Sequence, residues 1–187
     1  MKMTSVDQLF DCDLTPQSLV WNVGGFDGSF ASQIHDKYKC TVEVFEPMPD
    51  FAWNLDVKFQ GNRKIIVHHF GLGGRDGTCR MFWKGSMSGI HCDGKSFTVL
   101  VKSINRFSDG LNKPIDLLEI NIEGMEFELL ESVIDEGIAS RFRHIQVQFH
   151  GVVANNQQRK QEIREGLLKT HNLAFDDPWV WERYSLK

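Results

Sequence analysis

The stretch that decides the fold is VWNVGGFDG, from Val20 to Gly28, which is followed by FEP at Phe45 to Pro47. An apolar strand enters a cluster of glycines, a helix follows, and the next apolar strand ends in the acid Glu46. Glycines permit a sharp turn and a close approach to a ligand, and a helix N-terminus offers unpaired N–H groups. A carboxylate about 20 residues further on can accept hydrogen bonds from both hydroxyls of a ribose. The pattern therefore predicts a cradle for a nucleoside-containing cofactor.

Outward from this stretch, apolar segments alternate with amphipathic ones along most of the chain, which is typical of an α/β fold with a largely parallel sheet. We expect strands at 18–23, 41–45, 64–70, 115–122 and 144–149, and helices at 29–39, after Pro49, at 125–136 and at 156–170. Ser29 is the expected N-cap of the first helix, and Pro49 suits the first turn of the second.

Two further segments have their own signals. The glycine-rich region from Gly71 to Gly94, with short strand-like pieces at 79–83 and 96–101, indicates an elaborated loop region. Near the C-terminus, Asp176, Asp177 and Pro178 separate two aromatic runs. Turn-forming residues between strand-like runs predict an antiparallel hairpin at the edge of the sheet.

Length and charge limit the function. A chain of 187 residues with 41 % hydrophobic content has room for one domain over 1–187, with 1–17 as an N-terminal extension and 18–187 as the core. The net charge of −4 and the lack of a Lys or Arg run predict no nucleic-acid partner and no attraction to an anionic membrane. No segment resembles a signal peptide or a membrane span, so we expect a cytoplasmic protein.

The cysteines and histidines give no metal signature. The four cysteines lack CxxC spacing, which favours a reduced intracellular protein. The pairs His68-His69 and His91-Cys92 have no second pair at metal spacing, so we expect no metal site.

The spacing of the glycines narrows the choice of cofactor. Gly24, Gly25 and Gly28 form G-G-x-x-G, which departs from the dinucleotide pattern G-x-G-x-x-G. The methyltransferase pattern acid-x-G-x-G-x-G fits better over Asn22 to Gly28. Together with the FEP turn, the motifs GLGGRDG (71–77) and EINIEGMEFELL (119–130) make the chain from about Leu19 to Gly151 resemble the FkbM family of S-adenosylmethionine-dependent methyltransferases.

The resemblance implies a class I methyltransferase, or Rossmann-like, fold: a seven-stranded, mostly parallel sheet with helices on both faces and a C-terminal antiparallel hairpin. It also implies methyl transfer from S-adenosylmethionine to a hydroxyl on a sugar or small natural product, so the expected partner is a small-molecule or glycan acceptor. A small enzyme without a capping domain can close its site with a second subunit, which makes a homo-oligomer one expected assembly.

Four positions depart from the family pattern: Asn22 stands where the family has Asp, Phe26 where it has Asn, Glu119 where it has Lys, and Asn121 where it has Asp. Two carboxylates near the expected cofactor have thus become amides, which keep the hydrogen-bonding shape and lose the negative charge. A catalytically silent binding or assembly module is therefore the alternative hypothesis. A nicotinamide-dependent oxidoreductase is a third, which rests only on the general fold.

The expected site residues follow from these motifs. The cofactor-binding residues are Asn22, Gly24, Gly25, Gly28, Glu46, Pro47, Gly71, Leu72 and Asn121. The catalytic candidates are Glu123 and His150, each expected at the carboxyl end of a central strand. Purely structural roles stay open for these residues. The glycines can form a simple turn, and Gly71 and Leu72 a tight loop. Glu46 can cap a helix, and His150 can hydrogen-bond the backbone. We expect residues 86–88 to shape the acceptor pocket.

Overall fold

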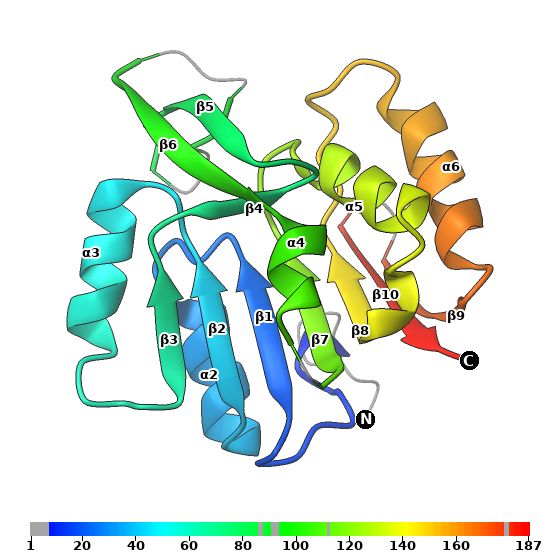
Figure 1. The fold of residues 1–187 in the computed structure, drawn as a ribbon, viewed down its shortest axis with the longest axis horizontal. Helices are drawn as coiled ribbons and strands as arrows, with labels where there is room; N and C mark the ends of the chain where they lie inside the picture. The colour runs from blue at the N-terminus through cyan, green and yellow to red at the C-terminus, as the bar shows by residue number, and fades with distance from the viewer. Residues whose placement is uncertain (1–7, 86–87, 91–93, 112, 178–179) are drawn as a thin grey trace.

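The computed structural model describes residues 8–85, 88–90, 94–111, 113–177 and 180–187. Its main sheet has seven strands in the order β3-β2-β1-β7-β8-β10-β9, and β10 alone runs antiparallel to its neighbours (Figure 1). The strands are β1 (Leu19–Val23), β2 (Thr41–Phe45), β3 (Ile65–His68), β7 (Ile115–Ile120), β8 (Phe142–Val147), β9 (His171–Asp177) and β10 (Trp181–Leu186). The predicted parallel sheet and C-terminal hairpin are confirmed.

Helices cover both faces of this sheet. They are α2 (Ser29–Tyr38), α3 (Pro49–Lys58), α4 (Ile104–Asp109), α5 (Glu126–Asp135) and α6 (Asn156–Leu167), with a 3₁₀ turn at Ala139–Arg141. Successive strand residues point to opposite faces, so Trp21 of β1 joins the core under α4, α5 and α6, whereas Val20 joins the core under α2 and α3. Both faces are apolar, which is why the predicted strands appear as continuous apolar runs.

The glycine-rich region is a second sheet, where a loop region was expected. Its strands are β4 (Gly71–Gly73), β5 (Gly77–Phe82) and β6 (Ser96–Ser103), in the order β4-β6-β5. Met81 and Val99 pack it on Met48 at the start of α3. This small sheet lies above the carboxyl ends of β1, β2 and β3 (Figure 1). β3 ends at His68, earlier than predicted, because the chain leaves the main sheet to pair with β6.

The start of α2 corrects one prediction and the start of α3 confirms another. Gly28, with φ +73°, is the N-cap of α2, and Ser29 is its first residue. The Asp27 carboxylate accepts hydrogen bonds from Ser29 N at 2.9 Å and Ser29 Oγ at 2.8 Å. Glycine adopts this left-handed conformation without a steric penalty. Pro49 is the first residue of α3, where its missing N–H costs no hydrogen bond.

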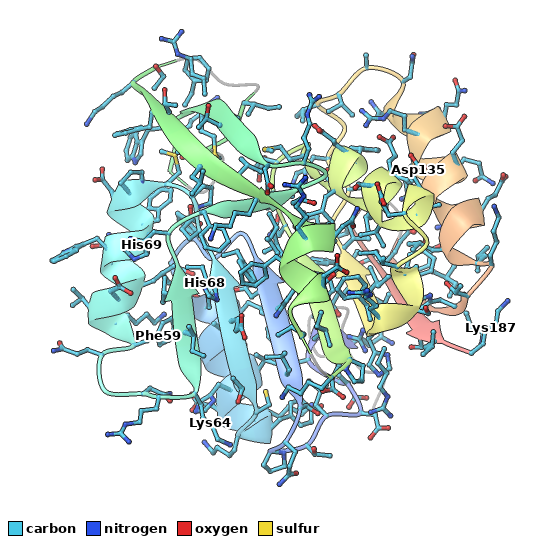
Figure 2. The ribbon with its side chains drawn as sticks, viewed as in Figure 1. Phe59, Lys64, His68, His69, Asp135 and Lys187 are labelled. Carbon is cyan, nitrogen blue, oxygen red and sulfur yellow. The ribbon has the colours of Figure 1, made fainter. Side chains whose placement is uncertain are left out.

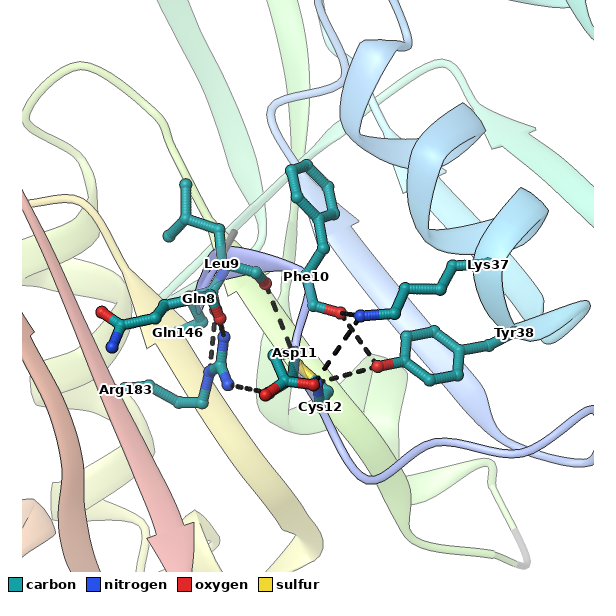
Figure 3. Close-up of polar contacts among 9 residues, drawn as sticks. All are labelled: Gln8, Leu9, Phe10, Asp11, Cys12, Lys37, Tyr38, Gln146 and Arg183. Atoms are coloured by element: carbon teal, nitrogen blue, oxygen red, sulfur yellow. Dashed lines mark hydrogen bonds and ion pairs between the residues drawn. The ribbon is translucent and has the colours of Figure 1, made fainter. Parts of the chain in front are cut away.

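The described part of the N-terminal extension lies on the α2 side of the sheet. Cys12 and Leu14 of this segment are buried in the core that also contains Ala31 and Ile34 of α2. Tyr38 of α2 donates its hydroxyl to Phe10 O at 2.9 Å and accepts from Cys12 N at 3.0 Å. Arg183 of β10 donates to Asp11 O at 2.6 Å and also to Gln8 O (Figure 3). Side chains from two distant elements therefore hold this segment.

Candidate functional site

A pocket of about 800 Å³, including its open mouth, lies between the carboxyl ends of β1, β2 and β7 and the underside of the small sheet. This is where ligands bind in open α/β sheets. Seven of the predicted site residues line it: Gly24, Glu46, Pro47, Gly71, Leu72, Asn121 and Glu123. Ser88 of the predicted acceptor loop lines it as well, whereas 86 and 87 lie outside the described residues.

Four predicted site residues, Asn22, Gly25, Gly28 and His150, are not among the lining residues. The structure gives Gly25 and Gly28 a packing reason. A Cβ on Gly25 would lie 2.4 Å from Val44 Cγ1, and one on Gly28 would lie 2.7 Å from side-chain carbons of Leu55 and Phe59. These two glycines allow α3 to pack closely behind the turn.

Gly24 is the glycine of the turn after β1 that lines the pocket. Its φ is +93°, and a Cβ there would lie 2.1 Å from the backbone oxygen of Asn121. The turn after β1 thus touches the backbone that follows β7. Any side chain at this position would push the two strand ends apart and change the floor of the pocket.

Glu46 is the acid at the end of β2, and only 4 % of its surface is exposed. Its Oε2 accepts from Phe26 N at 2.9 Å and its Oε1 from Met48 N at 2.8 Å. Burial raises the pKa of Glu46, and hydrogen bonds from the Met48, Phe26 and Gly25 N–H groups act in the opposite direction. Each carboxylate oxygen has two lone pairs. The three N–H groups therefore leave Glu46 one acceptor site for a hydroxyl in the pocket.

Asn22 and Glu119 form a buried pair behind the glycine turn. They are register partners on β1 and β7, with exposed fractions of 1 % and 2 %. Asn22 Nδ2 donates to Glu119 Oε2 at 2.5 Å, and Asn22 Oδ1 has no hydrogen-bond partner among the described residues. Burial raises the pKa of Glu119 to about 8, with the Asn22 hydrogen bond acting the other way. The sequence places both residues in strands, but only the strand register brings them together.

His150 lies between two carboxylates at the edge of the pocket. Its Nε2 is 3.3 Å from Glu123 Oε1, and its Nδ1 is 3.2 Å from Glu126 Oε1. Burial lowers the pKa of His150, but the hydrogen bond and charge of Glu126 and the charge of Glu123 together raise it above its ordinary value. The two catalytic candidates, Glu123 and His150, are therefore in contact. Of these two, Glu123 lines the pocket and His150 does not.

Glu126 is the member of this group that sequence reasoning missed. It is fully buried and accepts from His150 N at 2.7 Å and from Gly124 N at 2.8 Å. It thereby joins the segments that follow β7 and β8. Its position three residues after Glu123, in the first turn of α5, was the available signal. Glu123 itself has φ +51°, a conformation that non-glycine residues rarely adopt and that clusters at functional sites.

The histidines considered as metal ligands point to separate partners. His68 Nε2 lies 2.9 Å from Glu43 Oε2, and His69 Nε2 lies 2.7 Å from Asp56 Oδ2. Figure 2 labels both histidines near β3 and α3. His91 and Cys92 lie outside the described residues. No group of three metal-ligating side chains is found among the described residues, and the absence of a metal stays a prediction.

No protein-family model and no curated protein sequence matches this chain significantly. Solved structures do match. A putative rRNA methylase from Clostridium thermocellum aligns with TM-score 0.63 and 9 % identity over 100 % of this chain and 97 % of its own. A putative methyltransferase from Streptococcus mutans in complex with SAH aligns with TM-score 0.62 and 9 % identity over 100 % of both chains.

A third match is Aeropyrum pernix fibrillarin with natively bound S-adenosyl-L-methionine, with TM-score 0.54 and 12 % identity over 91 % of this chain and 67 % of its own. The chain has the class I methyltransferase fold. This confirms the predicted fold. The finer resemblance to FkbM proteins stays a prediction.

The comparisons correct the prediction of no nucleic-acid partner. Structures named as rRNA methylases match the whole chain, so the exclusion based on net charge was wrong. Net charge governs non-specific attraction to nucleic acid and does not determine which acceptor a fold of this class modifies. In the parts of the chain that the structure describes, no helix has the length and apolarity to span a membrane, and a cytoplasmic location stays a prediction.

Proposed function

We propose that this protein binds S-adenosylmethionine in the pocket and transfers its methyl group to an acceptor. The observation that carries the proposal is the position of Glu46, whose carboxylate binds the backbone of the glycine turn at Phe26 and lines the pocket with one acceptor site left. Structures of this fold that contain SAH or S-adenosyl-L-methionine support it.

The proposed contacts use the residues that line the pocket. Glu46 accepts a hydrogen bond from a ribose hydroxyl. Pro47, Gly71 and Leu72 contact the adenine, and Gly24 and Asn121 hold the methionine portion. Asn22, Gly25 and Gly28 support the turn from behind. The bound cofactor supplies an electrophilic methyl group on a sulfonium.

Glu123 is the proposed base, because its carboxylate lies at the pocket and contacts His150. It accepts the proton of the acceptor hydroxyl, and His150 stabilises it through Nε2. Glu126 orients the imidazole ring from the opposite side through Nδ1. Alignment of the reacting groups contributes roughly 7 to 11 kcal/mol, and a general base adds roughly a hundred- to ten-thousand-fold in rate.

We propose a hydroxyl oxygen as the acceptor atom, on a sugar or a small natural product, in keeping with the FkbM resemblance. The carboxylate of Glu123 at the pocket supports an acceptor that must lose a proton. The 2′-hydroxyl of an RNA ribose has the same chemistry. An acceptor screen should therefore contain oligoribonucleotides beside sugars.

Isothermal titration with S-adenosylmethionine and SAH tests the cofactor. We expect saturable binding by the folded wild-type protein, and absence of binding would overturn the proposal. Titration with NAD and NADP separates it from a nicotinamide-dependent oxidoreductase, because those cofactors should give no saturable heat.

A second candidate, a catalytically silent binding module, is favoured by the amide side chains of Asn22 and Asn121. Methyl transfer from radiolabelled S-adenosylmethionine to fractionated small molecules, glycans and RNA distinguishes the two. One acceptor with repeated turnover eliminates the silent module, whereas tight cofactor binding without product supports it.

A further inference from the structure

Four polar side chains form a buried row across the main sheet. Asn22 pairs in register with Glu119, Glu119 with Gln146, and Gln146 with Arg183. None of the four is more than 7 % exposed. A row of this kind within an apolar core is costly unless each group finds a partner.

Neither charged member of the row, Glu119 or Arg183, has an opposite charge as a direct partner among the described residues, and Gln146 lies between them. Arg183 donates to Gln146 Oε1 through Nε at 2.9 Å and Nη2 at 2.7 Å. Its other hydrogen bonds to described residues go to the carbonyls of Gln8 and Asp11 (Figure 3). Within the described residues no ion pair involves Glu119. Its hydrogen-bond partner is the neutral amide of Asn22.

The surroundings favour a neutral Glu119 in the free protein. A buried carboxylate without a cation is strongly disfavoured, and burial raises the pKa of Glu119 to about 8. A protonated carboxyl also provides an O–H donor beside Asn22 Oδ1, which otherwise has none among the described residues. The hydrogen-bonding groups of Glu119 and Asn22 are therefore all satisfied when Glu119 is a neutral carboxylic acid.

Among the described residues, the groups on neighbouring elements place no cation in direct contact with Glu119, because Gln146 separates it from Arg183. The neighbour on β8 is the neutral Gln146, and His144 of the same strand has its pKa lowered to about 4 by burial and by Arg143 and Arg183. From α2 the buried residues are Ala31 and Ile34, which do not titrate. Cys12 of the N-terminal segment has a raised pKa through burial and stays neutral.

The pair lies directly behind the proposed cofactor site. Asn22 Nδ2 is 3.5 Å from Gly24 O, and Gly24 lines the pocket. Asn121, two residues after Glu119, lines it as well. The sulfonium and ammonium groups of S-adenosylmethionine would introduce positive charge next to a buried acid that has no cation of its own.

We propose that Glu119 is a specificity-determining residue of the cofactor site: it gives up its proton when the cationic cofactor binds, and its carboxylate favours S-adenosylmethionine over the product SAH, which lacks the sulfonium charge. This inference rests on the proposed function. Glu119 thereby supplies the negative charge that the amides of Asn22 and Asn121 do not. The proton leaves to the buffer, so binding of the cation is coupled to release of the proton that Glu119 carries in the free protein.

The test is isothermal titration at pH 7 in two buffers of different ionisation enthalpy. The wild type should release a substantial fraction of a proton per S-adenosylmethionine bound. In Glu119→Gln most of this proton release should be lost. The preference for S-adenosylmethionine over SAH should fall about tenfold in Glu119→Gln, which corresponds to about one pKa unit of coupling. The comparison between variants cancels protons released by the cofactor itself.

Glu119→Gln is suited to this test because a glutamine can donate to Asn22 Oδ1 and accept from Asn22 Nδ2. Glu136→Gln, which removes an exposed acid, is the matched control and should behave like wild type. Equal proton release by wild type and Glu119→Gln, with both binding S-adenosylmethionine, overturns this inference alone. Absence of binding by the folded wild type overturns the proposed function, and this inference with it.

Discussion

Glu46 at the end of β2 accepts a 2.9 Å hydrogen bond from the backbone N–H of Phe26, which lies in the turn after β1. The acid and the glycine turn are thus one structural unit. Phe26 has φ +43°, an unfavourable conformation for a bulky residue, and this hydrogen bond helps to hold it. Phe26 also packs edge-on against Phe51 of α3, with ring centroids 5.1 Å apart.

The first prediction concerns Glu46→Gln. One amide oxygen can replace one carboxylate oxygen, but the new NH₂ group faces the N–H of either Phe26 or Met48. We expect affinity for S-adenosylmethionine to fall at least tenfold and the free energy of unfolding to fall by about 1–3 kcal/mol. Calorimetry and urea denaturation measure the two effects. Glu43→Gln on the same strand is the control, and unchanged cofactor affinity in Glu46→Gln would reject the ribose role.

The second prediction concerns Gly24→Ala. Its Cβ would lie 2.1 Å from Asn121 O in a conformation with φ +93°. We expect a loss of stability of more than about 2 kcal/mol and loss of cofactor binding. Gly77→Ala is the matched control, since nothing lies within 4 Å of its Cβ. Equal urea midpoints for the two variants would contradict the close contact between the ends of β1 and β7.

The third prediction concerns the protonation of His150. Its pKa is raised in the folded protein, so protonation stabilises the fold at pH values below the unfolded pKa of about 6.5, and this contribution is lost as pH rises through the raised value. NMR titration should therefore give a higher pKa for His150 than for His144, whose pKa is lowered to about 4.

The variants Glu126→Gln and Glu123→Gln test which carboxylates raise the pKa of His150. Each should lower the pKa of His150, with the larger change for Glu126→Gln, because Glu126 both bonds the ring and carries charge. The titration of His144 should not move, since neither carboxylate acts on it. If Glu126→Gln does not fold, the Glu123→Gln titration still decides whether the carboxylates hold the proton on His150.

The fourth prediction concerns Arg183 and the N-terminal segment. Arg183→Ala leaves the Gln146 amide oxygen and the carbonyls of Gln8 and Asp11 without their donor (Figure 3). We expect a loss of about 1–3 kcal/mol in stability and faster hydrogen exchange over 8–14. Arg143→Ala, which removes a more exposed contact to Asp13, should have a smaller effect. Unchanged exchange over 8–14 in Arg183→Ala would show that Tyr38 and the buried Leu14 suffice.

Local patterns predicted the elements whose stability depends on nearby residues. Continuous apolar runs indicated the buried parallel strands, and Pro49 marked the first residue of α3. The β4-β6-β5 sheet was read as loop, because pairing between Gly71–Gly73 and Val101–Ser103 joins segments far apart in sequence. Ser29 was expected as an N-cap, but the close packing of Phe59 and Leu55 requires glycine at 28.

The sequence by itself determined the fold class, the hairpin and the acid and glycine motifs around the pocket, because period and turn chemistry depend on neighbouring residues. Only the tertiary structure decided which of these residues meet: Glu126 with His150, Asn22 with Glu119, and Glu46 with Phe26. Strand register and burial set those contacts. The buried environment, which no single sequence position reveals, then sets the pKa values of Glu119 and His150 and hence the chemistry available to the site.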